Sequence, residues 1–250
     1  MSAKHFSLDH IHPSWHECLQ LALTQLNHDY VMELTKATDW LPGPSHIFNA
    51  FSLPLPQVNY VLFGESPYPR SESANGYAFW DASVHELWSS TGLSKKVNRA
   101  TSLRNMIKML LIAEGVLDAS KCAQTDIAHL TKSSFIQTND ELFHHLLDHG
   151  FLLLNATPVF RTKLAQKDAR AWRPFMKTLL AYLLEKKPDV TFVLLGRIAG
   201  MIDEFISPFK VNKIYAEHPY NLSFITNSKI LEFFEPLHLL KKTRMFAITP

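Results

Sequence analysis

The stretch that most constrains this chain runs from Val58 to Phe79 and reads VNYVLFGESPYPRSESANGYAF. Its apolar opening, Val58–Phe63, is typical of a buried β-strand. Gly64 ends this strand, and Pro67 and Pro69 prevent a helix from starting immediately afterwards. In open α/β sheets, ligands bind at the carboxyl edge of the strands. The stretch therefore predicts either an ordinary exit from a strand or one wall of a ligand site.

Three later stretches also pass from an apolar run into polar or special residues. They are FLLLNATPVFR (Phe151–Arg161), FVLLGR (Phe192–Arg197) and AEHPYNLS (Ala216–Ser223). Strand-like runs that alternate with helical segments indicate a mainly parallel sheet covered by helices. We therefore expect one α/β domain over residues 1–250, a three-layer sandwich around a central, mainly parallel four-stranded sheet.

Helical spacing of apolar residues and capping signals predict the covering helices. We expect an N-terminal helix from a capping box at Ser14–Glu17 to about Leu34, a helix over Ser102–Ala113, one from a capping box at Thr138–Glu141 to Gly150, one over Ala171–Lys187, one ending near Phe205, and a final helix from Asn227 or Ser228 to the basic segment Lys241–Arg244.

The segment Trp80–Arg99 has two interpretations. It carries two tryptophans and three cations, Trp80, Trp88, Lys95, Lys96 and Arg99. It can form a basic, aromatic surface next to a nucleic acid, or a helix whose apolar face packs and whose lysines are solvated. We favour the packed helix.

Composition excludes several classes of protein. The net charge is only +2, so any contact with nucleic acid must come from a local basic patch. Cys18 and Cys122 are the only cysteines, which rules out a disulfide framework and a four-cysteine zinc or iron–sulfur site. No apolar run approaches the roughly 20 residues of a membrane span, and the first residues lack the apolar core of a secretory signal. We expect a cytoplasmic protein, nucleoid-associated if bacterial.

Together with ATSLRNMIKML (Ala100–Leu110) and IFNAF (Ile47–Phe51), these stretches resemble the signature segments of the classical uracil-DNA glycosylase family. That family's pattern reads roughly GQDPYH…GLAF, PPSLxNM, LLLNxxxTVR, a strand ending in WGS, and HPSPLS. The order of the segments is the same here. The numbers of residues from Gly64 to Phe79 and from Asn155 to Arg161 also match the family pattern. The resemblance covers most of the chain. It implies a DNA repair enzyme that flips a damaged base out of the helix and hydrolyses its N-glycosidic bond.

The resemblance also implies residues that bind the base. Phe79 matches the aromatic residue that stacks under the base, and Asn155 the amide that hydrogen-bonds the uracil edge. Tyr68 matches the side chain that crowds the C5 position and excludes thymine. His218 matches the histidine that hydrogen-bonds uracil O2 while negative charge develops there.

Further residues match the family's contacts with DNA. Leu222 matches the apolar wedge inserted into the duplex. The remaining matches are expected at the DNA backbone: Ser102, Gly196, Arg197, Pro219 and Ser223. A plain helix cap would explain Ser102 equally well.

The motif after Gly64 departs from the family pattern. Ser66 stands where the family has an aspartate that orients the attacking water, and a serine hydroxyl cannot carry charge or act as a base at neutral pH. Pro69 replaces the family's histidine. Glu65 lies next to the missing aspartate, although neighbouring side chains of an extended turn usually point apart. We take His218, Ser66 and Glu65 as the candidate catalytic residues.

Two functional hypotheses follow. The first is a glycosylase that excises uracil or a related lesion, with activity impaired or altered by Ser66. The second is a catalytically inactive, DNA-binding or regulatory relative. Both imply DNA, single- or double-stranded, as the partner of a monomer that needs no membrane, no metal and no cofactor. We favour the enzyme because five specific groups of the base site are retained.

Overall fold

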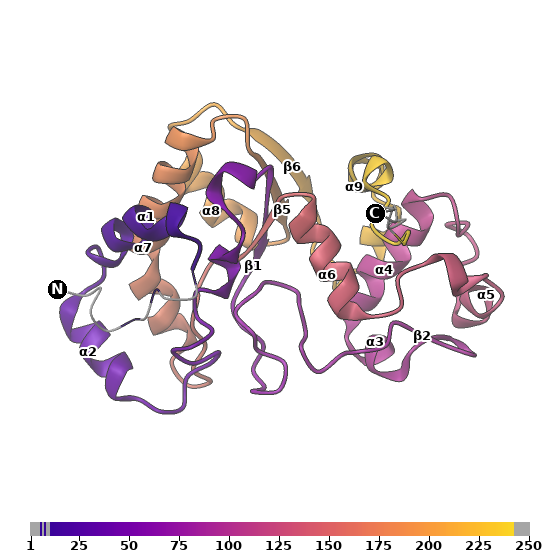
Figure 1. The fold of residues 1–250 in the computed structure, drawn as a ribbon, viewed down its shortest axis with the longest axis horizontal. Helices are drawn as coiled ribbons and strands as arrows, with labels where there is room; N and C mark the ends of the chain where they lie inside the picture. The colour runs from indigo at the N-terminus through magenta and orange to yellow at the C-terminus, as the bar shows by residue number, and fades with distance from the viewer. Residues whose placement is uncertain (1–5, 7, 9–10, 243–250) are drawn as a thin grey trace, which may run out of the picture. The chain divides into compact units, whose positions relative to one another are not determined.

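The computed structural model describes residues 6, 8 and 11–242, and the chain divides into two compact units. Unit 1 consists of Met1–Ser83 and Leu147–His218, and unit 2 of Val84–Leu146 and Pro219–Pro250 (Figure 1). Unit 2 therefore interrupts unit 1 in the sequence, and the second boundary falls between His218 and Pro219. A single domain over residues 1–250 stays a prediction.

A four-stranded parallel sheet forms the centre of unit 1, as predicted. Its strands are β1 (Tyr60–Gly64), β4 (Phe151–Asn155), β5 (Thr191–Leu195) and β6 (Asn212–Ala216), in the order β4-β1-β5-β6. Every neighbouring pair is parallel, so all four carboxyl ends lie at one edge. The register places Gly64 opposite Asn155, which aligns the ends of the first two predicted strands.

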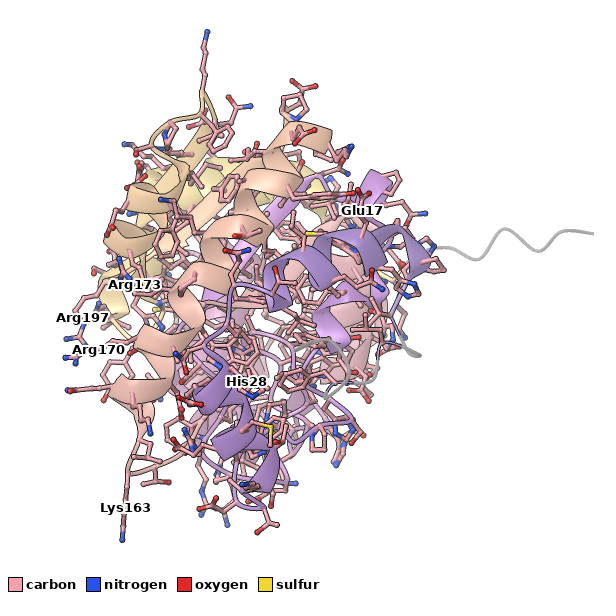
Figure 2. The ribbon with its side chains drawn as sticks, turned by 90° about the vertical axis from the view of Figure 1, so that its left-hand side faces the viewer. Glu17, His28, Lys163, Arg170, Arg173 and Arg197 are labelled. Atoms are coloured by element: carbon pink, nitrogen blue, oxygen red, sulfur yellow. The ribbon has the colours of Figure 1, made fainter. Side chains whose placement is uncertain are left out.

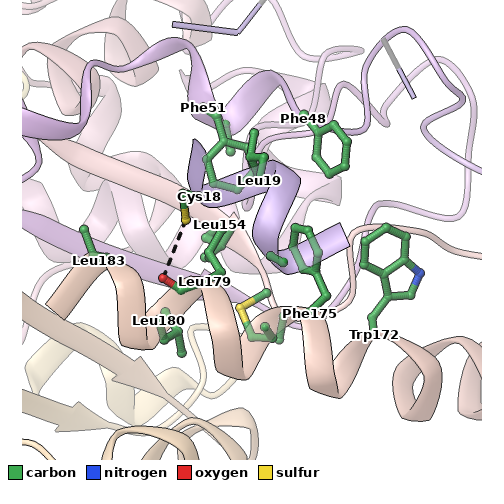
Figure 3. Close-up of a cluster of buried hydrophobic side chains, with 14 of the residues drawn as sticks. Cys18, Leu19, Phe48, Phe51, Leu154, Trp172, Phe175, Leu179, Leu180 and Leu183 are labelled. Atoms are coloured by element: carbon green, nitrogen blue, oxygen red, sulfur yellow. Dashed lines mark hydrogen bonds between the residues drawn. The ribbon is translucent and has the colours of Figure 1, made fainter. Parts of the chain in front are cut away.

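Helices α1 (His16–Leu23), α2 (His28–Lys36), α7 (Ala165–Lys186) and α8 (Ile198–Ile206) complete unit 1, with short 3-10 turns η2 (Pro13–Trp15), η3 (Asn49–Ser52) and η4 (Leu55–Gln57). Helices α1 and α7 pack together over fully buried aromatic and aliphatic side chains (Figure 3). The rings of Phe48 and Phe175 stack with centroids 6.0 Å apart. Burial, with a smaller contribution from Glu17, raises the pKa of the Cys18 thiol to about 12. Cys18 is therefore an inert core residue.

The N-terminal helix prediction was wrong in detail. Asn27 interrupts it, and its side chain accepts a hydrogen bond from Tyr30 N to cap α2. The predicted capping box at Ser14 does not form. Its Oγ accepts instead from Leu55 N at 2.9 Å, so this serine joins two distant parts of unit 1. Helix α7 begins at Ala165, six residues earlier than predicted, and contains Pro174 within it.

A buried polar network anchors the start of α7. Asp168 has no exposed surface, and it accepts hydrogen bonds from Tyr30 Oη at 2.9 Å and from Arg161 Nε at 3.2 Å. Arg161 also reaches Glu33 at 3.0 Å, and Trp172 Nε1 donates to Tyr30 Oη. Breaking one partner of such a buried pair leaves an uncompensated charge, so these residues fix the loop after β4 against α2.

Unit 2 is mostly helical. It contains the hairpin β2 (Trp88–Ser89) and β3 (Gly92–Leu93), and the helical segments α3 (Lys95–Arg99), α4 (Thr101–Ala113), α5 (Gln124–Ala128), η5 (Lys132–Ser134), α6 (Asn139–Asp148), η6 (Leu222–Thr226), α9 (Ser228–Phe234) and η7 (Glu235–Leu237). The capping box at Thr138 and Glu141 is confirmed by reciprocal hydrogen bonds.

Two predictions in unit 2 were wrong. The segment Trp80–Arg99 is not one helix, because Trp88 enters the hairpin and its Nε1 donates to Ile136 O at 2.7 Å. The final helix starts as predicted, capped by Asn227, but it ends at Phe234. Lys241 and Lys242 follow it, and Thr243 and Arg244 lie outside the described residues. None of the helices in the described part of the chain is long and apolar enough to cross a membrane.

Candidate active site

Backbone hydrogen bonds tie together the carboxyl ends of β1 and β4. Ala156 N donates to Gly64 O at 2.9 Å, and Thr157 N donates to Glu65 O at 3.0 Å. The chain then returns, because Ala78 N donates to Leu153 O at 3.1 Å. Residues from three separate parts of the sequence therefore meet at this edge of the sheet.

Asn155 is the most informative residue of this edge. It is only 4% exposed, and a Cβ added at Gly64 would lie 2.6 Å from its Oδ1, so only glycine fits opposite this amide. Its Nδ2 has no hydrogen-bond partner among the described residues. An unpaired buried donor costs about 1–3 kcal/mol, and such groups are rare in folded proteins. The free donor therefore indicates a ligand that offers an acceptor.

Phe79 lies next to Ala78 and has an unusual backbone. Its φ is +63°, a left-handed conformation that is strained for a bulky residue. Tyr68 Oη donates to the carbonyl of Phe79 at 3.1 Å and holds this conformation. Burial and then the nearby Asp81 carboxylate raise the pKa of Tyr68, so its hydroxyl stays protonated and remains a donor.

His218 faces Phe79, with ring centroids 5.9 Å apart and planes inclined by 35°. Gly196, at φ +65°, allows this approach, because a Cβ there would lie 2.7 Å from the Cβ of His218. Burial lowers the pKa of His218, and the Glu65 carboxylate partly opposes that shift. The imidazole is therefore neutral at pH 7, when one ring nitrogen can donate a hydrogen bond.

The residues expected to activate water are less enclosed. Ser66 is half-buried and Glu65 is exposed. Among the described residues, the Ser66 hydroxyl has no hydrogen-bond partner. Glu65 is close enough to His218 to act on it electrostatically, although its side chain is not a substitute for a buried aspartate. Unit 1 thus brings together all three candidate catalytic residues with Tyr68, Phe79 and Asn155.

Sequence reasoning missed Asp81, which organises the loop behind this site. Asp81 is 1% exposed, and it accepts hydrogen bonds from Arg70 Nη2 at 3.1 Å, from Ser83 N at 3.0 Å and from Ser83 Oγ at 2.7 Å. Ala82 N donates to Ser73 O and closes the loop. An aspartate two residues before a serine is a turn signal, and it could have identified this anchor.

Two other predicted residues lie at the same sheet edge in unit 1. Gly196 and Arg197 follow β5 directly, and α8 begins at the next residue. The guanidinium of Arg197 is exposed, and within the described part of the chain it forms no ion pair. An exposed cation without a counter-charge is available to bind an anion.

The other predicted DNA contacts belong to unit 2. Ser102 lies in the first turn of α4, which begins at Thr101 without a side-chain cap, so Ser102 is not the helix cap. Leu222 is 65% exposed at the start of η6, and Ser223 next to it is also exposed. Single exposed apolar side chains are common on protein surfaces, so exposure alone does not assign a role to Leu222.

Asn105, which sequence reasoning also missed, holds the loop that presents Leu222. This amide is 1% exposed within α4, and its Nδ2 donates to Pro219 O at 2.7 Å. Longer contacts reach the carbonyls of Tyr220 and Asn221. An amide on an otherwise apolar helix face was the available signal. Pro219 is therefore buried in a fixed loop, and Leu222 projects beyond it.

The described residues contain no group of three or more histidine, cysteine, aspartate or glutamate side chains that could hold a metal ion. The polar groups at the sheet edge are instead an amide, an imidazole, two hydroxyls and one exposed carboxylate. These groups are suited to hydrogen bonding a planar heterocycle. They can also position a water molecule.

Comparisons with known proteins agree with this geometry. The chain is similar to the wild-type UNG of Nitratifractor salsuginis, with a TM-score of 0.87 and 37% identity over 96% of this chain and 97% of that one. A mimivirus uracil-DNA glycosylase, at 20% identity and a TM-score of 0.59, shares the fold. A protein named uracil-DNA glycosylase from Amoebophilus asiaticus is 26% identical over 84% of both chains. The family model of the uracil DNA glycosylase superfamily matches residues 51–247, and the chain belongs to this superfamily.

Proposed function

We propose that this protein is a DNA repair glycosylase that flips uracil out of DNA and hydrolyses its N-glycosidic bond. The observation that carries the proposal is the buried amide of Asn155 with its unpaired Nδ2. Uracil presents an acceptor, O4, beside a donor, N3–H, and one carboxamide complements both. Cytosine presents the opposite pattern, a donor beside an acceptor, so a fixed amide orientation discriminates between the two bases.

Phe79 and Tyr68 define the rest of the base site. The Phe79 ring offers a flat apolar surface for stacking, and its strained backbone is fixed through Tyr68 Oη. The Tyr68 side chain stands where a methyl group at C5 would lie, and it thereby excludes thymine. Both roles need a rigid frame, which the backbone hydrogen bonds at the sheet edge supply.

His218 stabilises the departing base. As the C1′–N1 bond breaks, its electron pair passes to the uracil ring, and negative charge accumulates on O2. The neutral imidazole retains one N–H, and it donates a hydrogen bond from this group to the oxygen. Water then adds to C1′, and the proton that it releases passes through solvent to the departed uracil anion.

Ser66 and Glu65 act on the water and on the sugar. The Ser66 hydroxyl can accept or donate one hydrogen bond to the attacking water, but it cannot remove a proton. Glu65 supplies the nearest negative charge, and it favours the positive sugar that forms in the transition state. Because this carboxylate is exposed, its effect is screened by solvent. The reaction is therefore slower than it would be with a buried aspartate.

Contacts with the DNA backbone come from Gly196 and Arg197 in unit 1 and from Ser102 and Ser223 in unit 2. Pro219, which was also expected there, is buried and its carbonyl is bound by Asn105, so it shapes the loop instead. Leu222 fills the space left by the flipped base. The substrate is DNA that contains uracil or a related lesion, single- or double-stranded. We propose a cytoplasmic monomer, nucleoid-associated if bacterial, that acts without a cofactor.

The test uses uracil-containing and matched thymine-containing oligonucleotides, incubated with excess protein and then cleaved by alkali at abasic sites. We expect strand scission only with uracil, and its loss in Asn155→Ala. Scission that persists in Asn155→Ala would contradict the role of the amide.

A second candidate function is supported by Ser66, since the chain lacks the expected carboxylate at that position. In that case the protein binds uracil-containing DNA without cleaving it. Binding with no scission, together with scission gained in Ser66→Asp, would favour this regulatory function over the enzyme.

A further inference from the structure

A basic surface lies on one side of unit 1 (Figure 2). It contains Lys163 in the loop after β4, Arg170 in α7, and Arg197 after β5. Figure 2 shows these three residues, with Arg173, along the same side of the unit. We refer to Lys163, Arg170 and Arg197 as the basic strip.

The charge balance around the strip leaves it positive. Three acidic groups that contact α7 or the loop before it are already paired with cations outside the strip. Asp168 pairs with Arg161, Glu33 pairs with Arg161 and Lys167, and Glu204 pairs with Arg173 at 2.8 Å. The three cations of the strip are exposed, and within the described residues none of them forms an ion pair. Because the whole chain carries a net charge of only +2, this local concentration is significant.

Topology connects the strip to the site. Asn155 ends β4 and Arg197 follows β5, so both lie at the carboxyl edge of the parallel sheet. Helix α7 starts from the loop after β4, and it packs against α8, where Arg173 contacts the ring of Phe205 at 5.0 Å. The first turns of α7 therefore lie on the same surface of unit 1 as Arg197.

The surface beside the strip is hollowed. A depression of about 860 Å³ is lined by Tyr30, Lys163, Leu164, Lys167 and Arg170, among others. The Asp168 network fixes the backbone of the loop after β4 and the start of α7, from which these exposed cationic side chains project. An extended anion with evenly spaced charges, rather than a compact one, matches cations that follow an edge in this way.

We propose that Lys163 and Arg170 extend the DNA interface of unit 1 beyond Arg197, each of them binding a backbone phosphate next to the flipped nucleotide. This inference rests on the proposed function, and it adds two phosphate contacts that the family resemblance did not assign. The contacts are electrostatic and carry no base specificity. They strengthen binding before the chemical step, and the chemistry itself does not depend on them.

The experiment measures binding of a long uracil-containing duplex over a range of KCl concentrations. The test variant is the double substitution Lys163→Gln, Arg170→Gln. The control is Lys177→Gln, Lys186→Gln, which removes the same charge from later turns of α7. Loss of two phosphate contacts should reduce the slope of log Kobs against log [KCl] by ~1.8, whereas the control should keep the wild-type slope. The charge-conserving double variant Lys163→Arg, Arg170→Lys should also keep it.

A kinetic readout separates this proposal from the proposed function. With saturating protein, the single-turnover rate of base release should be the same in the wild type and in the Lys163→Gln, Arg170→Gln variant, while the protein concentration that gives half of the maximal rate rises. Equal slopes in the variant and the wild type would contradict phosphate binding by Lys163 and Arg170, and they would leave the glycosylase proposal unaffected. A wild-type protein without salt-dependent DNA binding would overturn both.

Discussion

The residues proposed to contact the base and the residues proposed to act on water differ in how firmly the protein holds them. Asn155 and Phe79 are buried, and hydrogen bonds from Ala78, Ala156 and Tyr68 fix the backbone around them. Glu65 is exposed and Ser66 is half-buried, and the Ser66 hydroxyl contacts no partner among the described residues. The proposed base site therefore belongs to the core, while the residues proposed to activate water lie at the solvated end of one strand.

This contrast separates specificity from rate. If the proposed roles hold, a rigid amide selects uracil whether or not the following step is fast. The rate depends on charge near the sugar, and here the only carboxylate of the motif is exposed. Changes in the two groups should therefore have different kinetic effects, and the predictions below are arranged by the expected size of those effects.

The largest effect is expected for Ser66→Asp. A carboxylate at this position can accept a proton from water and stabilise the positive sugar, so the single-turnover rate should rise by about 10²–10⁴-fold. Quenched-flow measurement of base release checks this. Ser66→Asn, which has the same shape without the charge, is the control. Equal rates for the two variants would show that charge at residue 66 is not limiting.

His218→Ala tests a residue that is proposed to contact the base. Removing one preorganised donor to a developing anion should lower the single-turnover rate by about 10²–10³-fold. DNA affinity should change little, because the hydrogen bond strengthens only as charge develops. The measurement pairs rate constants with binding of DNA that carries an uncleavable uracil analogue. A parallel loss of affinity and rate would assign His218 to ground-state binding.

Tyr68→Phe tests whether the base-contacting residues are as rigid as their hydrogen bonds imply. The substitution leaves the carbonyl of Phe79 without its partner and should reduce the free energy of unfolding by about 1–3 kcal/mol. Denaturant unfolding gives this value. Tyr77→Phe, which removes a hydrogen bond to the exposed Ser52, is the control and should cost less. The opposite order would mean that the strain at Phe79 needs no support.

The smallest effect concerns pH near neutrality. Burial lowers the pKa of His218, so the imidazole stays neutral as pH falls to its ordinary value, and activity should decline only below that point. The unfolded chain binds this proton more readily, so stability also decreases as pH falls from the ordinary His pKa through the lowered one. Rate profiles from neutral to acidic pH check both.

Glu65→Gln sharpens the pH experiment. The Glu65 carboxylate opposes the lowering of the His218 pKa. Its removal should lower this pKa further and shift the acidic decline of the rate profile to lower pH. His145→Gln, in unit 2, is the control and should not change the pH at which the rate declines. A profile that does not move in Glu65→Gln would show that Glu65 and His218 are not coupled.

The sequence predicted the sheet well because apolar runs and glycines report strand cores and strand ends directly. Val58–Phe63 and Phe151–Leu154 became neighbouring parallel strands with Gly64 opposite Asn155. Their convergence followed from the parallel arrangement alone. The short hairpin at Trp88 was missed because two-residue strands leave no periodic pattern.

The candidate site was predictable only where a residue type has a local signature. Gly64 and the proline-rich turn could be identified without coordinates. The free Nδ2 of Asn155, the left-handed backbone of Phe79 and the anchoring of Pro219 by Asn105 depend on contacts between distant segments. Asp81 is the intermediate case, since its turn was readable but its burial was not.

The interruption of unit 1 by unit 2 affects how the chain can fold during synthesis. Strand β1 lies inside the sheet, but both of its neighbours, β4 and β5, are translated only after residues 84–146 of unit 2. At typical elongation rates β1 leaves the ribosome on the order of ten seconds before β4. During that interval its apolar side chains have no partner strand. The nascent chain is then most exposed to aggregation, so chaperones and lower growth temperatures should improve the yield of folded protein.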